Sequence, residues 1–135
     1  MEEVGTDRER LDSFTAPLAA GMNTIGRGRP WAFSHFRKTN GYANMPLDGL
    51  WLRAPYLHNG SVPDLRALLF PEERPATFWR AYDVYDWDRV GFVSRGSGAE
   101  AEGVAYDTTL RGNANVGHLY GTDLPTATKL ALLEY

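Results

Sequence analysis

Glycine and proline, spread along the whole chain, are the feature that most limits what this sequence can fold into. The 135 residues include 14 glycines and 8 prolines, and these break almost every apolar run. Because both residues interrupt helices and strands, the sequence predicts much irregular backbone and few long elements. Hydrophobic residues still make up 43% of the chain, which is enough for a core and disfavours extensive disorder. The length fits a single domain.

Composition also excludes several classes of function. The formal net charge is −3, with 14 basic and 17 acidic residues well mixed along the chain. Neither nucleic-acid binding nor attraction to an anionic membrane is therefore expected. The absence of cysteine excludes disulfides, thiolate metal sites and thioether-linked cofactors on these residues alone. No apolar stretch approaches the ~20 residues of a membrane span, and the first residues lack the pattern of a signal peptide.

Three segments have helical patterns. The first, residues 7–14, is weak and has one apolar pair at i, i+3 spacing. The second, residues 61–70, begins with Ser61 as a cap and with Asp64 completing a capping box. The third, residues 123–135, has a clear 3.6-residue apolar period that continues to the last residue, with Thr122 or Asp123 as its cap. The predicted fold class is therefore mainly α with long irregular loops.

Two other segments complete the predicted organisation. Short apolar alternation between residues 82 and 106 predicts one small β-hairpin around the turn at residues 95–98. Between residues 21 and 60, aromatic side chains occur at no steady period, which is typical of a segment that wraps over another surface. The aromatic loops of residues 31–56 therefore allow one class of function, a module that binds a partner protein.

The three histidines are the candidates for chemistry. His35 lies among aromatic residues and before two cations, which favours a structural role. His58 lies in a Pro-Tyr-Leu-His-Asn-Gly-Ser turn, where hydrogen bonds from its ring to the backbone of its own turn would fix the loop. His118 lies between Gly117 and Gly121, and glycines permit a flat ligand or a metal to approach the backbone closely.

A zinc site built from all three histidines is disfavoured, because no pair has the i, i+3 or i, i+4 spacing of helical metal motifs. The acidic residues near the middle of the chain are expected to be solvated surface. We assign no catalytic residue.

Residues 47–65, LDGLWLRAPYLHNGSVPDL, resemble the signature of the bacterial di-haem cytochrome c peroxidase superfamily. The branch that they resemble most is the group of large cytochromes c that includes the rubber oxygenases. Residues 38–49, 71–78 and 117–124 are similar to the same branch, so the resemblance extends over most of residues 4–135. The Pro-Tyr-Leu-His-Asn-Gly-Ser run is the most specific part of it.

The resemblance implies haem c as the cofactor, bound in that family by a Cys-x-x-Cys-His motif. This chain lacks the motif, so residues 1–135 are expected to be a single partial cytochrome c-like domain from a truncated gene or fragment. The family has its second axial ligand, usually methionine, shortly before the last helix, where this chain has His118. His118 is therefore the expected iron ligand, with Met45 as a competing ligand. The resemblance implies that His58 is a turn residue of the haem pocket and that Arg53 pairs with a haem propionate.

The function that the resemblance implies is electron transfer through haem c, with haem and a redox protein as partners, in the periplasm or outside the cell. The parent protein would be a di-haem peroxidase or oxygenase, or a cytochrome that serves one. This chain alone is expected to be no enzyme and to hold haem poorly, because it lacks two thioether bonds and the proximal histidine. The alternative is the non-haem module with aromatic loops.

Overall fold

The computed structural model describes residues 4–43 and 45–135. It contains short helices and two small antiparallel sheets joined by long loops. In chain order the elements are α1 (Glu9–Ser13), α2 (Ala16–Met22), a 3-10 helix (Leu50–Leu52), α3 (Leu65–Leu69), a second 3-10 helix (Pro71–Glu73), β1 (Thr77–Arg80), β2 (Tyr85–Asp86), β3 (Gly91–Phe92), α4 (Ser97–Glu102), β4 (Val104–Asp107) and α5 (Thr126–Glu134).

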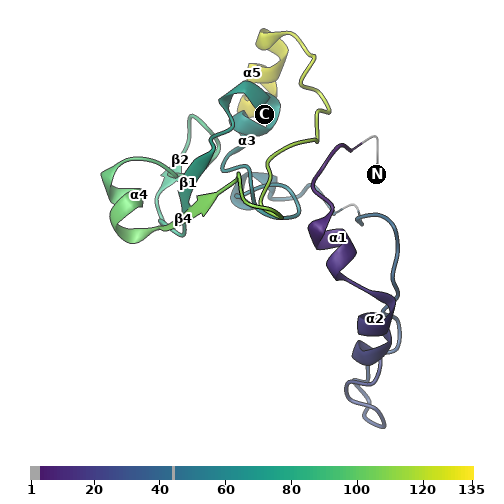
Figure 1. The fold of residues 1–135 in the computed structure, drawn as a ribbon. Coiled ribbons are helices and arrows are strands. Elements are labelled where there is room, and N and C mark those ends of the chain that lie inside the picture. Colours follow the sequence, from purple (N-terminus) through teal and green to yellow (C-terminus); the bar gives the residue numbers. More distant parts are fainter. Residues whose placement is uncertain (1–3, 44) are drawn as a thin grey trace.

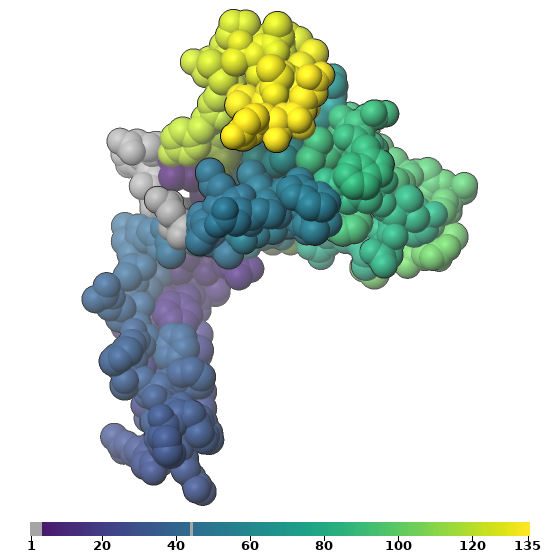
Figure 2. Space-filling model, turned by 180° about the vertical axis from the view of Figure 1, so that it is seen from behind, coloured from purple at the N-terminus to yellow at the C-terminus, as the bar shows by residue number. Residues whose placement is uncertain are grey.

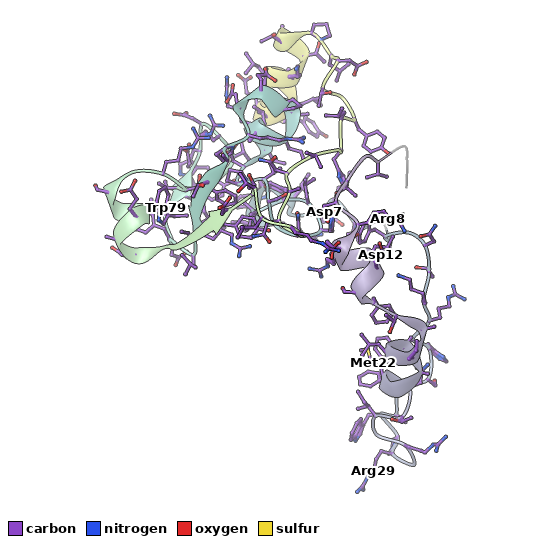
Figure 3. All side chains as sticks on the ribbon, in the orientation of Figure 1. Asp7, Arg8, Asp12, Met22, Arg29 and Trp79 are labelled. Carbon is purple, nitrogen blue, oxygen red and sulfur yellow. The ribbon has the colours of Figure 1, made fainter. Side chains whose placement is uncertain are left out.

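The molecule consists of a body and an arm (Figure 1). The body holds the sheets with α3, α4 and α5, whereas α1, α2 and the loop after α2 project away from it. Figure 2 shows the same arm from behind. In Figure 3, Asp7, Arg8 and Asp12 lie where the arm meets the body, and Arg29 lies at its far end. Within the arm, the side-chain Nδ2 of Asn23 donates to the carbonyl of Phe36, and its Oδ1 accepts from the backbone N–H of Phe36. These two bonds connect the end of α2 to the loop that follows it.

The prediction of a mainly α fold is wrong. Helices account for 29% of the chain and strands for 11%. The two longest predicted helices are shorter than predicted, because α3 begins only at Leu65 and α5 only at Thr126. The irregular loops that the glycines and prolines predict make up most of the rest of the described residues.

The helix predicted for residues 61–70 begins only at Leu65. Asp64 is its N-cap, because the carboxylate Oδ1 accepts a hydrogen bond from the backbone N–H of Ala67 at 2.7 Å. Ser61 is not a cap. Its side chain is buried, and its Oγ has no hydrogen-bond partner within the described residues.

The helix predicted for residues 123–135 begins at Thr126, and neither Thr122 nor Asp123 caps it. The hydroxyl of Thr122 instead donates to the carbonyl of Leu119 at 2.8 Å. The weak pattern at residues 7–14 does form a helix, α1. The sequence did not predict α2, which Thr15 caps by accepting from the N–H of Leu18.

The predicted turn at residues 95–98 is also wrong, since Ser97–Glu102 forms α4. A hairpin exists earlier in the chain, where β2 pairs with β3. β4 returns to pair with β1 in antiparallel register. This second pairing puts Phe78 opposite Tyr106, with ring centroids 5.4 Å apart. Phe78 is almost fully buried and lies at the centre of this sheet.

A second core surrounds the turn of residues 55–61. Tyr56 and Val62 close the turn by a β-bridge and, with Ala67 of α3, form a buried cluster. The phenol of Tyr56 donates to the carbonyl of Leu50 at 2.9 Å, which attaches the first 3-10 helix to the turn. The Pro-Tyr-Leu-His-Asn-Gly-Ser run is therefore a packed loop with fixed ends.

Ion pairs join α3 to the β2–β3 hairpin. The buried carboxylate of Asp64 contacts the Nε of Arg89 at 2.9 Å. Arg89 also contacts Glu73, and Glu73 contacts Arg66 at 2.8 Å. Hydrogen bonds from Arg66 hold the pKa of the Glu73 carboxyl below its ordinary value. This network fixes the segment that follows the Pro-Tyr-Leu-His turn.

Within the described part of the chain, no helix is both long and apolar enough to cross a membrane.

Candidate functional site

The structure brings two of the three histidines together. The rings of His58 and His118, 60 residues apart in sequence, have centroids 6.2 Å apart and planes tilted by 33°. His58 comes from the turn after the first 3-10 helix, and His118 comes from the loop between β4 and α5. Neither residue lies in a regular element, so the loops around them must be held by other contacts.

The ring of His58 packs between the body and the beginning of the chain. Tyr42 stacks on it with centroids 4.5 Å apart and an interplanar angle of 17°. Its Nδ1 lies 3.5 Å from the hydroxyl of Thr6. The prediction that the ring hydrogen-bonds within its own turn is therefore wrong: the hydroxyl that it meets is 52 residues away.

His118 has a backbone shape that is rare outside glycine, with φ of +52°. Its N–H donates to the carbonyl of Val4 at 2.8 Å, so the first described residues cover this loop. Gly117 has φ of +76°, and its Cα lies against the same segment. The glycine before His118 thus permits a close backbone approach by the chain's own residues 4–6, whereas the prediction was the approach of a flat ligand or a metal.

Two side chains tie the histidine loops to the rest of the body. The side-chain Nδ2 of Asn59 donates to the carbonyls of Gly112 and Ala114, and the backbone carbonyl of Asn59 accepts from the phenol of Tyr106. Arg74 donates to the carbonyls of the loop that ends at His118. Asn59 thus connects the 55–61 turn to the 112–114 loop and to β4, and Arg74 connects the 115–118 loop to α3, so together they set the distance between the two imidazoles.

The surroundings of both imidazoles lower their pKa and so favour the neutral form. Burial is the main cause that lowers the pKa of His58, and the charge of Arg10 adds to it. Burial also lowers the pKa of His118, with further contributions from His58 and Arg74. A neutral imidazole has a free lone pair, which is the form that binds a metal.

One nitrogen of each ring is buried without a partner. Within the described residues, His58 Nε2 and His118 Nδ1 have no hydrogen-bond partner. A buried polar atom of this kind calls for an explanation, such as a ligand or a water molecule. The arrangement can therefore supply one or two neutral nitrogen ligands from a partly buried position.

We expect stability to fall as the solution becomes acidic, because both histidines have a lower pKa in the folded chain than in the unfolded one. The unfolded chain then binds more protons, starting near the ordinary histidine pKa of about 6.5. The stability that the two neutral histidines contribute is fully present above that pH and is lost as the pH falls through their lower folded-state pKa values. Urea unfolding midpoints between pH 7.5 and 5 will measure this loss. The H58Q/H118Q double variant should have a flatter profile, and an equally steep one would contradict this cause.

Gly117→Ala is expected to destabilise the chain by about 1–3 kcal/mol, because a side chain at this backbone shape is strained. An added Cβ would also lie 2.3 Å from the Val4 carbonyl oxygen. Gly28→Ala is the matched control, since Gly28 has φ of +81° but open space around it. Urea unfolding should show a larger loss for Gly117→Ala. Equal losses would show that residues 4–6 do not cover the loop.

The other predicted site residues lie apart from the imidazole pair. Met45 is 71% exposed. Arg53 is exposed, and its Nη1 donates to the carbonyl of Pro46 at 2.8 Å. Neither forms a hydrogen bond to an imidazole among the described residues. His35 is exposed and contacts Ser34. No group of three or more histidines or acidic residues that could hold a metal ion occurs in the described ranges, so the three-histidine zinc site is excluded there.

Comparison with known proteins gives a family for the segment that carries His58. Residues 41–80 match the family model described as RoxA-like, cytochrome c-like. These residues form a segment of a RoxA-like, cytochrome c-like domain. The resemblance predicted from the Pro-Tyr-Leu-His-Asn-Gly-Ser run is thereby confirmed. The cytochrome c-like segment includes Tyr42, His58, Asn59 and Arg74, whereas His118 lies beyond it.

Two relatives from Sinorhizobium fredii (strain NBRC 101917 / NGR234) match a larger part of the chain. The uncharacterized protein y4iJ is 36% identical over 134 residues, covering 92% of this chain and 22% of that protein. The uncharacterized protein y4iM is 44% identical over 84 residues, covering 58% of this chain and 19% of that protein. The chain thus spans about a fifth of the length of these curated relatives.

The sequence analysis missed four residues of the site. Thr6 contacts His58 from the beginning of the chain, and Tyr42 contacts it from the loop that precedes the first 3-10 helix. No local sequence pattern indicates these contacts. Asn59 and Arg74 stand inside the motifs that carry the family resemblance. Their presence in those motifs was a signal, but only the structure shows which carbonyls they bind.

Proposed function

We propose that this chain supplies the axial-ligand side of a haem c site in an electron-transfer cytochrome, and that His118 is the ligand. The observation that carries the proposal is the partly buried imidazole of His118, whose Nδ1 has no hydrogen-bond partner within the described residues. The match of residues 41–80 to a cytochrome c-like family supports haem as the group bound.

The residues present fit one axial ligand. Bound haem c would supply the one-electron chemistry of its iron. His118 would hold that iron through a ring nitrogen, and His58 would pack beside it as part of the pocket. Covalent attachment needs cysteines that this chain does not have, so the two thioether bonds would come from a Cys-x-x-Cys-His segment outside these residues.

Other groups have lesser parts in the proposal. Arg53 would pair with a haem propionate, because only its bond to Pro46 occupies it among the described residues. Met45 is the competing ligand and is exposed enough to reach a group at the surface. A second imidazole on the iron should give a lower reduction potential than methionine. The proposal includes a location of the intact protein in the periplasm or outside the cell and a redox protein as its partner, and the resemblance of residues 41–80 to a cytochrome c-like family supports both.

The test uses the unaltered chain and a haem c peptide, that is, a short Cys-x-x-Cys-His peptide with its haem attached and its own histidine on the iron. The sixth position of this iron is free to accept a ligand. Adding the chain at micromolar concentration should convert the optical spectrum from high spin to low spin. An unchanged spectrum would refute the proposal and favour the alternative, a protein-binding module whose loop residue Trp31 is 62% exposed.

A further inference from the structure

Arg74 makes an unusual set of hydrogen bonds beside the His118 loop. Its Nε donates to Ala67 O at 3.1 Å and its Nη2 to Leu68 O at 3.3 Å. Its Nη1 donates to Asn115 O at 2.7 Å and Gly117 O at 2.9 Å, and its Nη2 also donates to His118 O at 3.3 Å. A guanidinium has five N–H donors in a fixed plane. All five are therefore used on backbone carbonyls, two at the end of α3 and three in the His118 loop.

No carboxylate neutralises this guanidinium among the described residues. The ion pairs of that part of the chain involve Arg8, Arg66, Arg89 and Arg111, and the neighbouring Glu73 is bound to Arg66 and Arg89. Arg74 is half-buried, and burial lowers its pKa. Arginine nevertheless stays protonated in proteins, so a positive charge remains next to the His118 loop.

The groups that face His118 can be named for each element around it. His58 comes from the 55–61 turn, Arg74 directly follows the second 3-10 helix, and Val4 comes from the beginning of the chain. Val4 contributes only a carbonyl. Arg74 is thus the permanently charged group among these neighbours of His118.

We propose that Arg74 is the positioning residue of the His118 ligand site. Its planar fork fixes the backbone from Asn115 to His118 against α3. Lysine cannot replace it, because an ammonium has three donors around one point and cannot reach five carbonyls. The ligand role of His118 rests on the proposed function, whereas the positioning of the loop does not.

The test compares Arg74→Lys and Arg74→Gln with Arg111→Lys, a matched control at an exposed arginine paired with Glu9. Without haem, both Arg74 variants should show faster hydrogen exchange of the His118 amide. With the haem c peptide, both variants should bind at least about tenfold more weakly, as when a residue that orients a metal ligand is replaced.

Failure of this inference can be told apart from failure of the proposed function. If the unaltered chain gives no low-spin spectrum, the proposed function fails, and hydrogen exchange still decides the role of Arg74. Wild-type exchange rates of the His118 amide in the Arg74 variants would overturn the inference. If the variants do not fold, the test is hydrogen exchange of the Arg74 guanidinium in the unaltered chain. Its N–H groups should exchange more slowly than those of Arg27, which is exposed. Equal rates would overturn the inference.

Discussion

In the titration with the haem c peptide, His118→Ala is expected to abolish the low-spin spectrum that the unaltered chain produces. The peptide's histidine occupies one side of the iron, so low spin requires a strong ligand on the other side. The neutral imidazole of His118 is the proposed ligand, and alanine offers no lone pair. His118→Met should keep the low-spin state and raise the reduction potential, because a thioether favours reduced iron.

The matched control for this variant is His35→Ala. His35 is exposed and does not belong to the imidazole pair, so its loss should leave the spectrum low-spin. His58→Ala should also leave it low-spin but weaken binding, because His58 packs beside the ligand. Low-spin iron with His118→Ala and high-spin iron with His58→Ala would transfer the ligand role to His58.

Asp64→Ala should destabilise the fold by about 3–5 kcal/mol, the loss typical when one partner of a buried ion pair is removed. Asp64 is 2% exposed, caps α3 and contacts Arg89. Its loss leaves the Arg89 guanidinium, 24% exposed, without this partner. Domains are stable by only about 5–15 kcal/mol. Asp64→Ala should therefore lower the urea midpoint steeply.

Two further variants separate the two roles of Asp64. Asparagine caps helices as well as aspartate, so Asp64→Asn should recover the cap, lose the ion pair and have intermediate stability. Asp12→Ala removes an exposed i, i+4 pair with Arg8 and should cost less than about 1 kcal/mol. If Asp64→Ala cost no more than Asp12→Ala, the network would not hold α3 in place.

The sequence could predict those features of the fold that depend on single residues or on one short motif. The glycines and prolines predicted the long loops, and the Pro-Tyr-Leu-His-Asn-Gly-Ser run predicted the family. The helix starts were wrong because the choice between Ser61 and Asp64 as the cap depends on tertiary contacts: the bridge between Tyr56 and Val62 extends the chain through Ser61.

The candidate site was less predictable, because its geometry comes from pairs of residues far apart in sequence. Arg74 binds carbonyls 41 to 44 residues away, and Thr6 meets His58 across 52 residues. Contacts between residues so far apart leave no periodic pattern in the amino-acid sequence. The fold class failed for a related reason: β1 and β4 pair across α4, whereas the alternation between residues 82 and 106, which includes β4 but not β1, was attributed to one local hairpin.

The central claim is that His118 binds haem iron, and a crystal structure of the chain with the haem c peptide tests it most directly. The measurement is the distance from the iron to each candidate ligand atom. The account predicts a ring nitrogen of His118 at about 2 Å, a normal length for a bond from histidine to a metal. His58, Met45 or a water molecule at that position, with the His118 ring away from the iron, would contradict it.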